Sequence, residues 1–142
     1  MDLTLQAGST TLNIRVAVLI KTEKGFVFEK HKDGYYFIIG GRIKINETSE
    51  EAARREISEE LGISITNMKL SAVIENFYGL PGDSVHEICF VYTSDEVLGI
   101  EIPGEFAEIS IDQIGGMDVR PSVVKEVIKA ESSSFLHLIT RQ

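Results

Sequence analysis

The stretch that decides the fold runs from Gly41 to Ile63 and reads GRIKINETSEEAARREISEELGI. Thr48, followed three residues later by Glu51, forms a capping box, which predicts that a helix begins here. Helix-forming Ala, Arg and Glu residues continue to Leu61, and Gly62 is placed for a C-terminal stop. We therefore expect an amphipathic helix that lies close to a sheet through an apolar stripe of Ala52, Ala53, Ile57 and Leu61.

The acidic residues of this helix are unusually arranged. Glu56, Glu59 and Glu60 have the spacing i, i+3 and i+4, so their carboxylates project from one face within about one turn. Like charges at this spacing repel one another, and hard carboxylate oxygens suit Mg²⁺ or Mn²⁺. Arg55 lies roughly 100° around the helix from Glu56 and can reach back toward Glu47 in the preceding loop. The pattern thus predicts a divalent-cation site.

The same stretch resembles the signature box of the Nudix hydrolases. That pattern is Gly, five residues, Glu, seven residues, and then Arg-Glu-aliphatic-x-Glu-Glu-x-Gly-aliphatic. A chance match at a given start has a probability of roughly 10⁻⁹ from average residue frequencies. All nine positions are filled, by Gly41, Glu47, Arg55, Glu56, Ile57, Glu59, Glu60, Gly62 and Ile63.

The segment before the box is similar to the family pattern aromatic-x-aliphatic-Pro-Gly-Gly, with two departures. Tyr36 stands for the usual Trp, and Ile39 for the usual Pro. The double glycine that follows lacks Cβ atoms, so its backbone can approach a metal or phosphate closely. Inside the box, Lys44 replaces a common acidic residue and Asn46 a common glycine. Asn tolerates the left-handed conformation, so the loop is expected to be kept, whereas Lys44 could alter substrate or metal preference.

The resemblance implies an α/β domain, a Nudix-type α/β/α sandwich with a mixed sheet between helices, spanning residues 1–142. It implies Mg²⁺-dependent hydrolysis, with Mn²⁺ as an alternative, of a phosphoanhydride bond in a nucleoside diphosphate-linked compound. A non-catalytic nucleotide-sensing or binding module on the same fold is the alternative. Such a module need not keep its metal carboxylates, and this chain has all three.

The resemblance also implies roles for individual residues. The metal ligands would be Glu56, Glu59, Glu60 and the carbonyl of Gly40, while Arg55 and Glu47 would fix the loop against the helix. The catalytic set is thus expected to comprise the three glutamates with Arg55 and Glu47. An additional base or ligand is expected from Glu101 or Glu105. The candidates for substrate binding are Arg15, Tyr36, Gly41, Lys44, Phe77 and Tyr78.

Composition narrows the classes of partner. The 142 residues carry a net charge of −8, which argues against binding to nucleic acid or anionic membranes through a basic surface. The first residues lack the basic and apolar regions of a signal peptide, and no apolar run is long enough to span a membrane. We therefore expect a cytoplasmic protein whose partner is a small nucleotide, with a homodimer left open. Cys89, the sole cysteine, is expected to be a small core residue.

Apolar patterning predicts the remaining elements. Strands are expected at 13–20, 26–29, 35–39, 70–78, 86–92, 107–111 and 135–140, with a second helix from Pro121 to residue 130. Residues 94–105 contain Gly, Pro and acidic residues and predict a loop. Glu75 and Glu87 are expected mainly on surface faces of their strands, with a position in the site as the alternative. Phe77 and Tyr78 could stack on a nucleobase.

Overall fold

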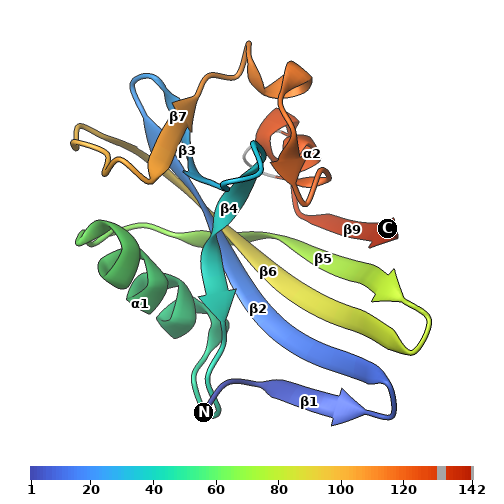
Figure 1. Cartoon of the computed structure of the whole chain (residues 1–142). Helices are drawn as coiled ribbons and strands as arrows, with labels where there is room; N and C mark the ends of the chain where they lie inside the picture. The colour runs from blue at the N-terminus through green and yellow to red at the C-terminus, as the bar shows by residue number, and fades with distance from the viewer. Residues whose placement is uncertain (131–133, 142) are drawn as a thin grey trace.

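A mixed β-sheet runs through the molecule, and helices α1 and α2 lie against its opposite faces (Figure 1). The computed structural model describes residues 1–130 and 134–141. Its helices are α1 (Ser49–Leu61) and α2 (Val124–Lys129), with one 3₁₀ turn at Ile114–Gly116. Its strands are β1 (Thr4–Ala7), β2 (Thr10–Thr22), β3 (Gly25–Lys30), β4 (Tyr36–Arg42), β5 (Lys69–Leu80), β6 (Asp83–Leu98), β7 (Phe106–Ile109), β8 (Val119–Arg120) and β9 (Leu136–Arg141).

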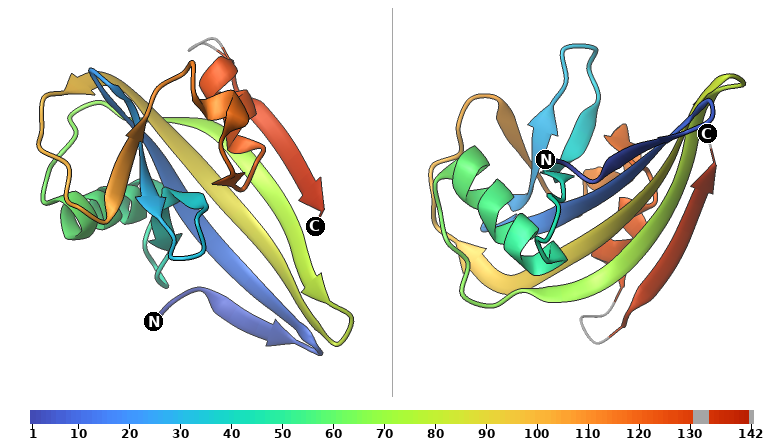
Figure 2. Two further views of the ribbon diagram at one scale, coloured as in Figure 1. Left: turned by 45° about the horizontal axis from the view of Figure 1, so that its top comes forward. Right: turned by 90° about the horizontal axis from the view of Figure 1, so that it is seen from below.

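The strands pair in the order β7-β3-β4-β2-β6-β5-β9, with β1 added to β2 and β8 added to β4. Strand β2 lies at the centre, antiparallel to β4 and parallel to β6. The long strands β2, β5 and β6 curve strongly, as both turned views show (Figure 2). The expected α/β fold with a mixed sheet is therefore confirmed.

Helix α1 begins and ends where the sequence predicts. The Thr48 side chain accepts a hydrogen bond from the Glu51 backbone N–H, and the Thr48 backbone N–H donates to the Glu51 carboxylate, which completes the capping box. Gly62 ends the helix in the left-handed conformation, with φ 68°. Ala52 and Ala53 are fully buried, so the helix packs closely on the sheet beside β4 and β2.

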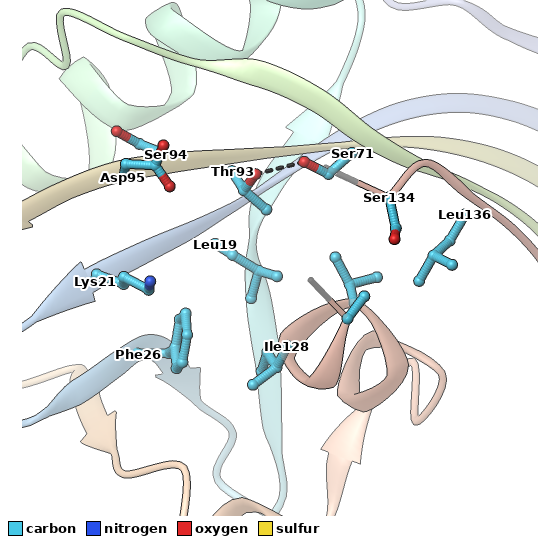
Figure 3. A pocket seen from close by; sticks show the side chains of 12 residues that line it. Leu19, Lys21, Phe26, Ser71, Thr93, Ser94, Asp95, Ile128, Ser134 and Leu136 are labelled. Atoms are coloured by element: carbon cyan, nitrogen blue, oxygen red, sulfur yellow. Dashed lines mark hydrogen bonds between the residues drawn. The ribbon is translucent and has the colours of Figure 1, made fainter. Parts of the chain in front are cut away.

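Helix α2 covers the other face of the sheet and is shorter than predicted. It begins at Val124, because the segment after Pro121 first forms turns that lead from β8 into the helix. Beside the end of α2, side chains from β2, β5 and β6 line a small cavity of about 130 Å³ (Figure 3). Its polar lining includes Ser71 and Thr93, whose hydroxyls hydrogen-bond to each other.

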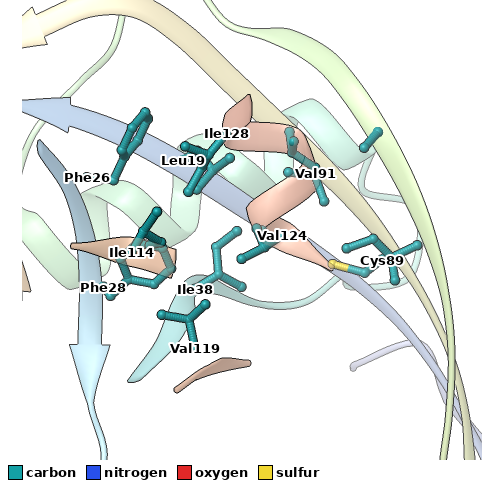
Figure 4. Close-up of a cluster of buried hydrophobic side chains, with 14 of the residues drawn as sticks. Leu19, Phe26, Phe28, Ile38, Cys89, Val91, Ile114, Val119, Val124 and Ile128 are labelled. Atoms are coloured by element: carbon teal, nitrogen blue, oxygen red, sulfur yellow. The ribbon is translucent and has the colours of Figure 1, made fainter. Parts of the chain in front are cut away.

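The sheet divides the hydrophobic core into two layers. One layer packs against α1 and is built around Val16, Val18 and Ile39. The other packs against α2, and Leu19, Phe28, Ile38 and Val91 converge there with Val124 and Ile128 of the helix (Figure 4). Cys89 belongs to this second layer, as expected, and burial raises the pKa of its thiol to about 12. Alternate residues of β2 thus serve opposite layers.

Two connections, the one after β6 and the one between β5 and β6, are shorter than the sequence predicts. Strand β6 continues to Leu98, whereas residues 94–105 were predicted to form a loop. The extension pairs Val97 and Leu98 with Lys21 and Thr22 of β2, so tertiary pairing overrides the weak strand propensity of this acidic segment. Strands β5 and β6 likewise extend to Leu80 and Asp83, which leaves only a tight turn between them.

Candidate active site

The side chain of Arg55 joins the loop before α1 to the carboxylates on the helix. Its Nε and Nη2 donate to Glu47 at 2.7 and 2.9 Å, and Nη2 also donates to the carbonyl of Arg42 at 3.1 Å. Its Nη1 donates to Glu56 at 2.9 Å and to Glu59 at 3.4 Å. The expected contact with Glu47 is present, and the contacts with Glu56 and Glu59 are additional. One guanidinium therefore partly neutralises three carboxylates.

The loop itself is shaped to present Glu47. Asn46 adopts the left-handed conformation, with φ 67°, as expected for a residue in place of glycine. The backbone N–H of Lys44 donates to Glu47 Oε1 at 3.0 Å. The bond from Arg55, together with this one, lowers the pKa of Glu47 to about 2. Glu47 is thus held as a carboxylate between the loop and the helix.

Gly41 makes room for the carboxylate of Glu56. A Cβ atom placed on Gly41 would lie 2.2 Å from Glu56 Oε1, closer than any real contact. The neighbouring Gly40 is pressed equally closely against β2, because its Cβ would lie 2.0 Å from the carbonyl oxygen of Val16. Glu56 is 9% exposed, so the double glycine allows a buried carboxylate to lie directly on the β4 backbone.

Two further carboxylates lie near Glu60. Burial raises the pKa of Glu60, and the charges of Glu29, Glu56, Glu59 and Glu105 raise it further. Burial also raises the pKa of Glu29, which is increased again by Glu105. Of the two loop candidates, Glu105 is therefore the one whose charge acts on the helix carboxylates. The sequence analysis did not identify Glu29.

Strand pairing explains how Glu29 and Glu105 come together. Glu29 of β3 lies opposite Phe106 of β7, the residue that follows Glu105. It also lies opposite Phe37 of β4, on the side of the hairpin that faces α1. Only the position of Glu29 beside a segment almost eighty residues later in the chain brings it to the site. The run FVFEK by itself carries no sign of this role.

These donors fit a divalent cation, although they do not form a ready-made cage. Among residues 1–130 and 134–141, no three Asp, Glu, His or Cys side chains converge closely enough to hold a metal ion. Carboxylates nevertheless outnumber the cations here, and their negative charge adds to burial in raising the pKa of Glu60. Hard oxygen ligands with excess negative charge are what Mg²⁺ or Mn²⁺ require.

A cavity of about 360 Å³ opens on the α2 side of the sheet. Its walls come from β2, β4, β5 and β6, and its rim from the hairpin between β3 and β4 and from Arg120. Arg15 Nε lies 4.0 Å from Glu87 Oε2 within it. At the rim, the rings of His31 and Tyr35 stack with centroids 4.2 Å apart, and the Arg120 guanidinium lies 3.7 Å from the Tyr35 centroid. A volume of this size can hold a small organic ligand.

Only some of the candidates for substrate binding line this cavity. Arg15 and Tyr78 both line the cavity. Phe77 does not, because adjacent residues of β5 point to opposite faces; its ring lies 4.4 Å from that of His86 and beneath Arg141. Tyr36 packs against the core on the α2 side, and Lys44 is exposed in the loop before α1. Glu101 is exposed as well, and its charge is not among those that raise the pKa of Glu60.

Other cavity residues were not among the candidates for substrate binding. Glu87, Asn76 and His31 line it, and Glu87 and Asn76 are both buried, whereas Glu87 was expected mainly on the surface. Glu75, by contrast, lies on the outer face of β5, where His137 contacts it at 2.6 Å. Period-two alternation predicts that Glu75 and Asn76 face opposite ways, but it does not predict which face borders a cavity.

Comparison with known proteins connects this geometry to a family. The model of the family described as NUDIX domain matches residues 11–121. NAD-capped RNA hydrolase NudC of Vibrio cholerae is 28% identical over 66% of this chain and 32% of its own length. An 8-oxo-dGTP diphosphatase of Buchnera aphidicola is 31% identical over 46% of this chain and 54% of its own length. The chain thus spans about a third and about half of these two relatives.

A solved structure shares the fold. The MutT protein of Bacillus halodurans superposes with a TM-score of 0.73 over 91% of this chain and 89% of its own, at 18% sequence identity.

Neither helix of the described residues has the length and apolar character that crossing a membrane requires.

Proposed function

The chain belongs to the Nudix family, and on that premise we propose that it hydrolyses a phosphoanhydride bond in a nucleoside diphosphate-linked compound, with Mg²⁺ or Mn²⁺ as cofactor. The observation that carries the proposal is the position of Glu56. Its carboxylate lies against the glycine backbone of Gly41 and is held there by Arg55, which Glu47 anchors in turn. Glu59 and Glu60 lie beside it on the same helix face.

Each group then has a role in the reaction. Glu56, Glu59, Glu60 and the Gly40 carbonyl would hold the cations. Bound divalent cations neutralise charge on phosphate oxygens and orient the attacking water. One carboxylate, from the helix or from Glu105, would accept the proton of that water. Arg55 and Glu47 act through the others, by fixing the loop and the orientation of Glu56.

The nucleoside part of the substrate would occupy the cavity on the α2 side of the sheet. Arg15 supplies positive charge there, and this charge offsets part of the rise that burial and Glu105 cause in the pKa of Glu29, so the cavity lies within electrostatic reach of the carboxylates. The stacked rings at the rim suit a nucleobase or its ribose. The substrates named for the two curated relatives, NAD-capped RNA and 8-oxo-dGTP, both contain phosphoanhydride bonds, which supports this reaction class.

A panel assay tests the proposal. The purified chain would be incubated with nucleoside triphosphates, ADP-ribose, NAD, dinucleoside polyphosphates and sugar nucleotides, with Mg²⁺ and with EDTA, and the products separated by chromatography. We expect a nucleoside monophosphate from at least one compound, only when metal is present. Tight binding of a nucleotide without turnover under any metal condition would instead support the non-catalytic module.

A further inference from the structure

Arg15 and Glu87 place opposite charges side by side inside the cavity. They come from neighbouring parallel strands, β2 and β6, in which Arg15 is paired with Cys89, two residues from Glu87 on the same face. The Glu87 side chain is 10% exposed and that of Arg15 33% exposed. Their separation of 4.0 Å is longer than a hydrogen bond, so both groups can still accept or donate to a ligand.

Tyr78 lies beside Glu87 in the cavity, two residues along β5 from Asn76, the partner of Glu87 in β6. Burial raises the pKa of the Tyr78 hydroxyl, and the charge of Glu87 raises it further, so this hydroxyl stays protonated. A carboxylate offers about four lone-pair positions, so Glu87 can accept hydrogen bonds from a ligand in the cavity even with the Tyr78 hydroxyl beside it. Apolar side chains of Ala17, Ile38 and Ile74 line the same cavity beside the polar groups.

We propose that this pair makes the cavity selective for a guanine base; the inference rests on the proposed function and names the substrate class for it. On its pairing edge guanine carries two adjacent N–H donors, at N1 and the 2-amino group, next to the acceptor O6. The carboxylate of Glu87 accepts from the two donors, and the Arg15 guanidinium donates to O6. Arg15 and Glu87, with Nε and Oε2 4.0 Å apart, thus offer a donor next to acceptors, as the pairing edge of guanine requires.

The other bases do not match this arrangement. Adenine presents an amino donor where Arg15 requires an acceptor, and a bare ring nitrogen where Glu87 requires a donor. Cytosine carries one amino group beside two acceptors, and thymine carries a single N–H between two carbonyls. Each would leave the buried carboxylate of Glu87 or the guanidinium of Arg15 without a matching partner, and sites built on such groups reject mismatched ligands strongly.

The test compares dGTP, dITP, dATP, dCTP and dTTP as substrates of the full chain, by kcat/KM at saturating Mg²⁺. dITP lacks only the 2-amino group, so it probes one hydrogen bond without altering the protein. We expect dGTP to exceed dITP by roughly tenfold and dATP by roughly a hundredfold, the range of one and two hydrogen bonds to a charged group. Glu87→Gln should reduce the ratio of dGTP to dITP to near one, because the amide turns a donor toward the base.

Glu75→Gln is the matched control. Glu75 lies on the outer face of the neighbouring strand β5 and contacts His137, so its variant should keep both the activity and the preference of the parent chain. Melting curves verify that both variants are folded, and the dITP comparison on the unaltered chain stands even where Glu87→Gln is unstable. Equal kcat/KM for the five nucleotides, or a ratio of dGTP to dITP that Glu87→Gln leaves unchanged, would overturn the inference.

A binding measurement separates this inference from the proposed function. Deoxyguanosine and deoxyadenosine carry no phosphate, so they can be titrated into the metal-free chain and followed by NMR. Tighter binding of deoxyguanosine by at least tenfold, lost in Glu87→Gln, supports guanine selectivity whether or not any nucleotide is hydrolysed. Equal affinity for the two nucleosides counts against it, even where hydrolysis itself is observed.

Discussion

Arg55 holds Glu47 through two parallel hydrogen bonds, from Nε to Oε2 at 2.7 Å and from Nη2 to Oε1 at 2.9 Å. The two side chains are 20% and 14% exposed. A bidentate pair of this kind fixes orientation as well as distance, so the loop that carries Glu47 and the helix that carries Arg55 move as one unit. Because Arg55 also donates to Glu56, the position of that carboxylate depends on the pair.

Replacing Arg55 should therefore affect both stability and activity. Arg55→Ala leaves three carboxylates without their shared cation, and we expect a loss of about 2–4 kcal/mol in the free energy of unfolding. Arg55→Lys keeps the charge but not the planar fork, so it should recover only part of both properties. Urea titrations measure the effect on stability, and kcat/KM measures the effect on activity. An unchanged urea midpoint in Arg55→Ala would show that the contacts of Arg55 contribute little to the stability of the fold.

The same pair predicts an acid-sensitive component of stability. The pKa of Glu47 is about 2 in the folded chain, below its ordinary value of 4.5. A lowered folded pKa contributes stability that is fully present above the ordinary pKa and is lost as pH falls toward the folded one. The difference in unfolding free energy between the parent chain and Glu47→Gln should be constant from pH 7 to about 5 and should shrink from there to about pH 2. A difference in unfolding free energy that is as large at pH 2 as at pH 7 would contradict the lowered pKa of Glu47.

Metal removal tests the carboxylate face directly. Activity on the best substrate should vanish in EDTA and return with excess Mg²⁺ or Mn²⁺, because the phosphate charges and the helix carboxylates both require divalent cations. Ca²⁺, which prefers more ligands at longer distances, serves as a comparison and should restore less activity. Full turnover in EDTA would refute the proposed metal site.

Variants of Glu60 and Glu50 compare a proposed metal ligand with an exposed glutamate of the same helix. Glu60→Gln removes the charge that a hard cation needs, and turnover should fall by roughly 10²-fold or more. It also relieves repulsion with the surrounding carboxylates, so the metal-free chain should melt at the same temperature or slightly higher. Glu50 forms an exposed pair with Arg54 at 3.4 Å, so Glu50→Gln should change neither property by much. Near-full kcat in Glu60→Gln at saturating Mg²⁺ would disprove the assignment of this helix face.

Gly41→Ala tests the close approach of the backbone to Glu56. The added methyl group would lie 2.2 Å from Glu56 Oε1, so the carboxylate must move away from the β4 backbone. We expect at least a tenfold loss of kcat/KM, since small displacements of a positioned group reduce rates strongly. Gly116→Ala is the control, because its added Cβ meets nothing within 4 Å. Equal activity of the two variants would indicate that the exact position of Glu56 does not matter.

The sequence by itself determined helix α1 and the contact of Arg55 with Glu47 in the loop before it. The start of the helix at Thr48, its end at Gly62 and the contact of Arg55 with Glu47 were all predicted correctly. These features depend on residues a few positions apart, where capping and the geometry of the helix leave few alternatives. The spacing of the box then identified the family, and the fold followed from it.

Only the tertiary structure decided which distant residues join the site. Glu29 and Glu105 meet because β3 pairs with β7, and Glu105 rather than Glu101 lies at the end of that pairing. Tyr78 and Glu87 line the cavity, whereas Phe77 points away, because side chains alternate along a strand and a one-residue change of phase reverses the face. The local sequence fixes that alternation. Which of the two faces borders a cavity depends on the neighbouring strands, and these come from distant parts of the chain.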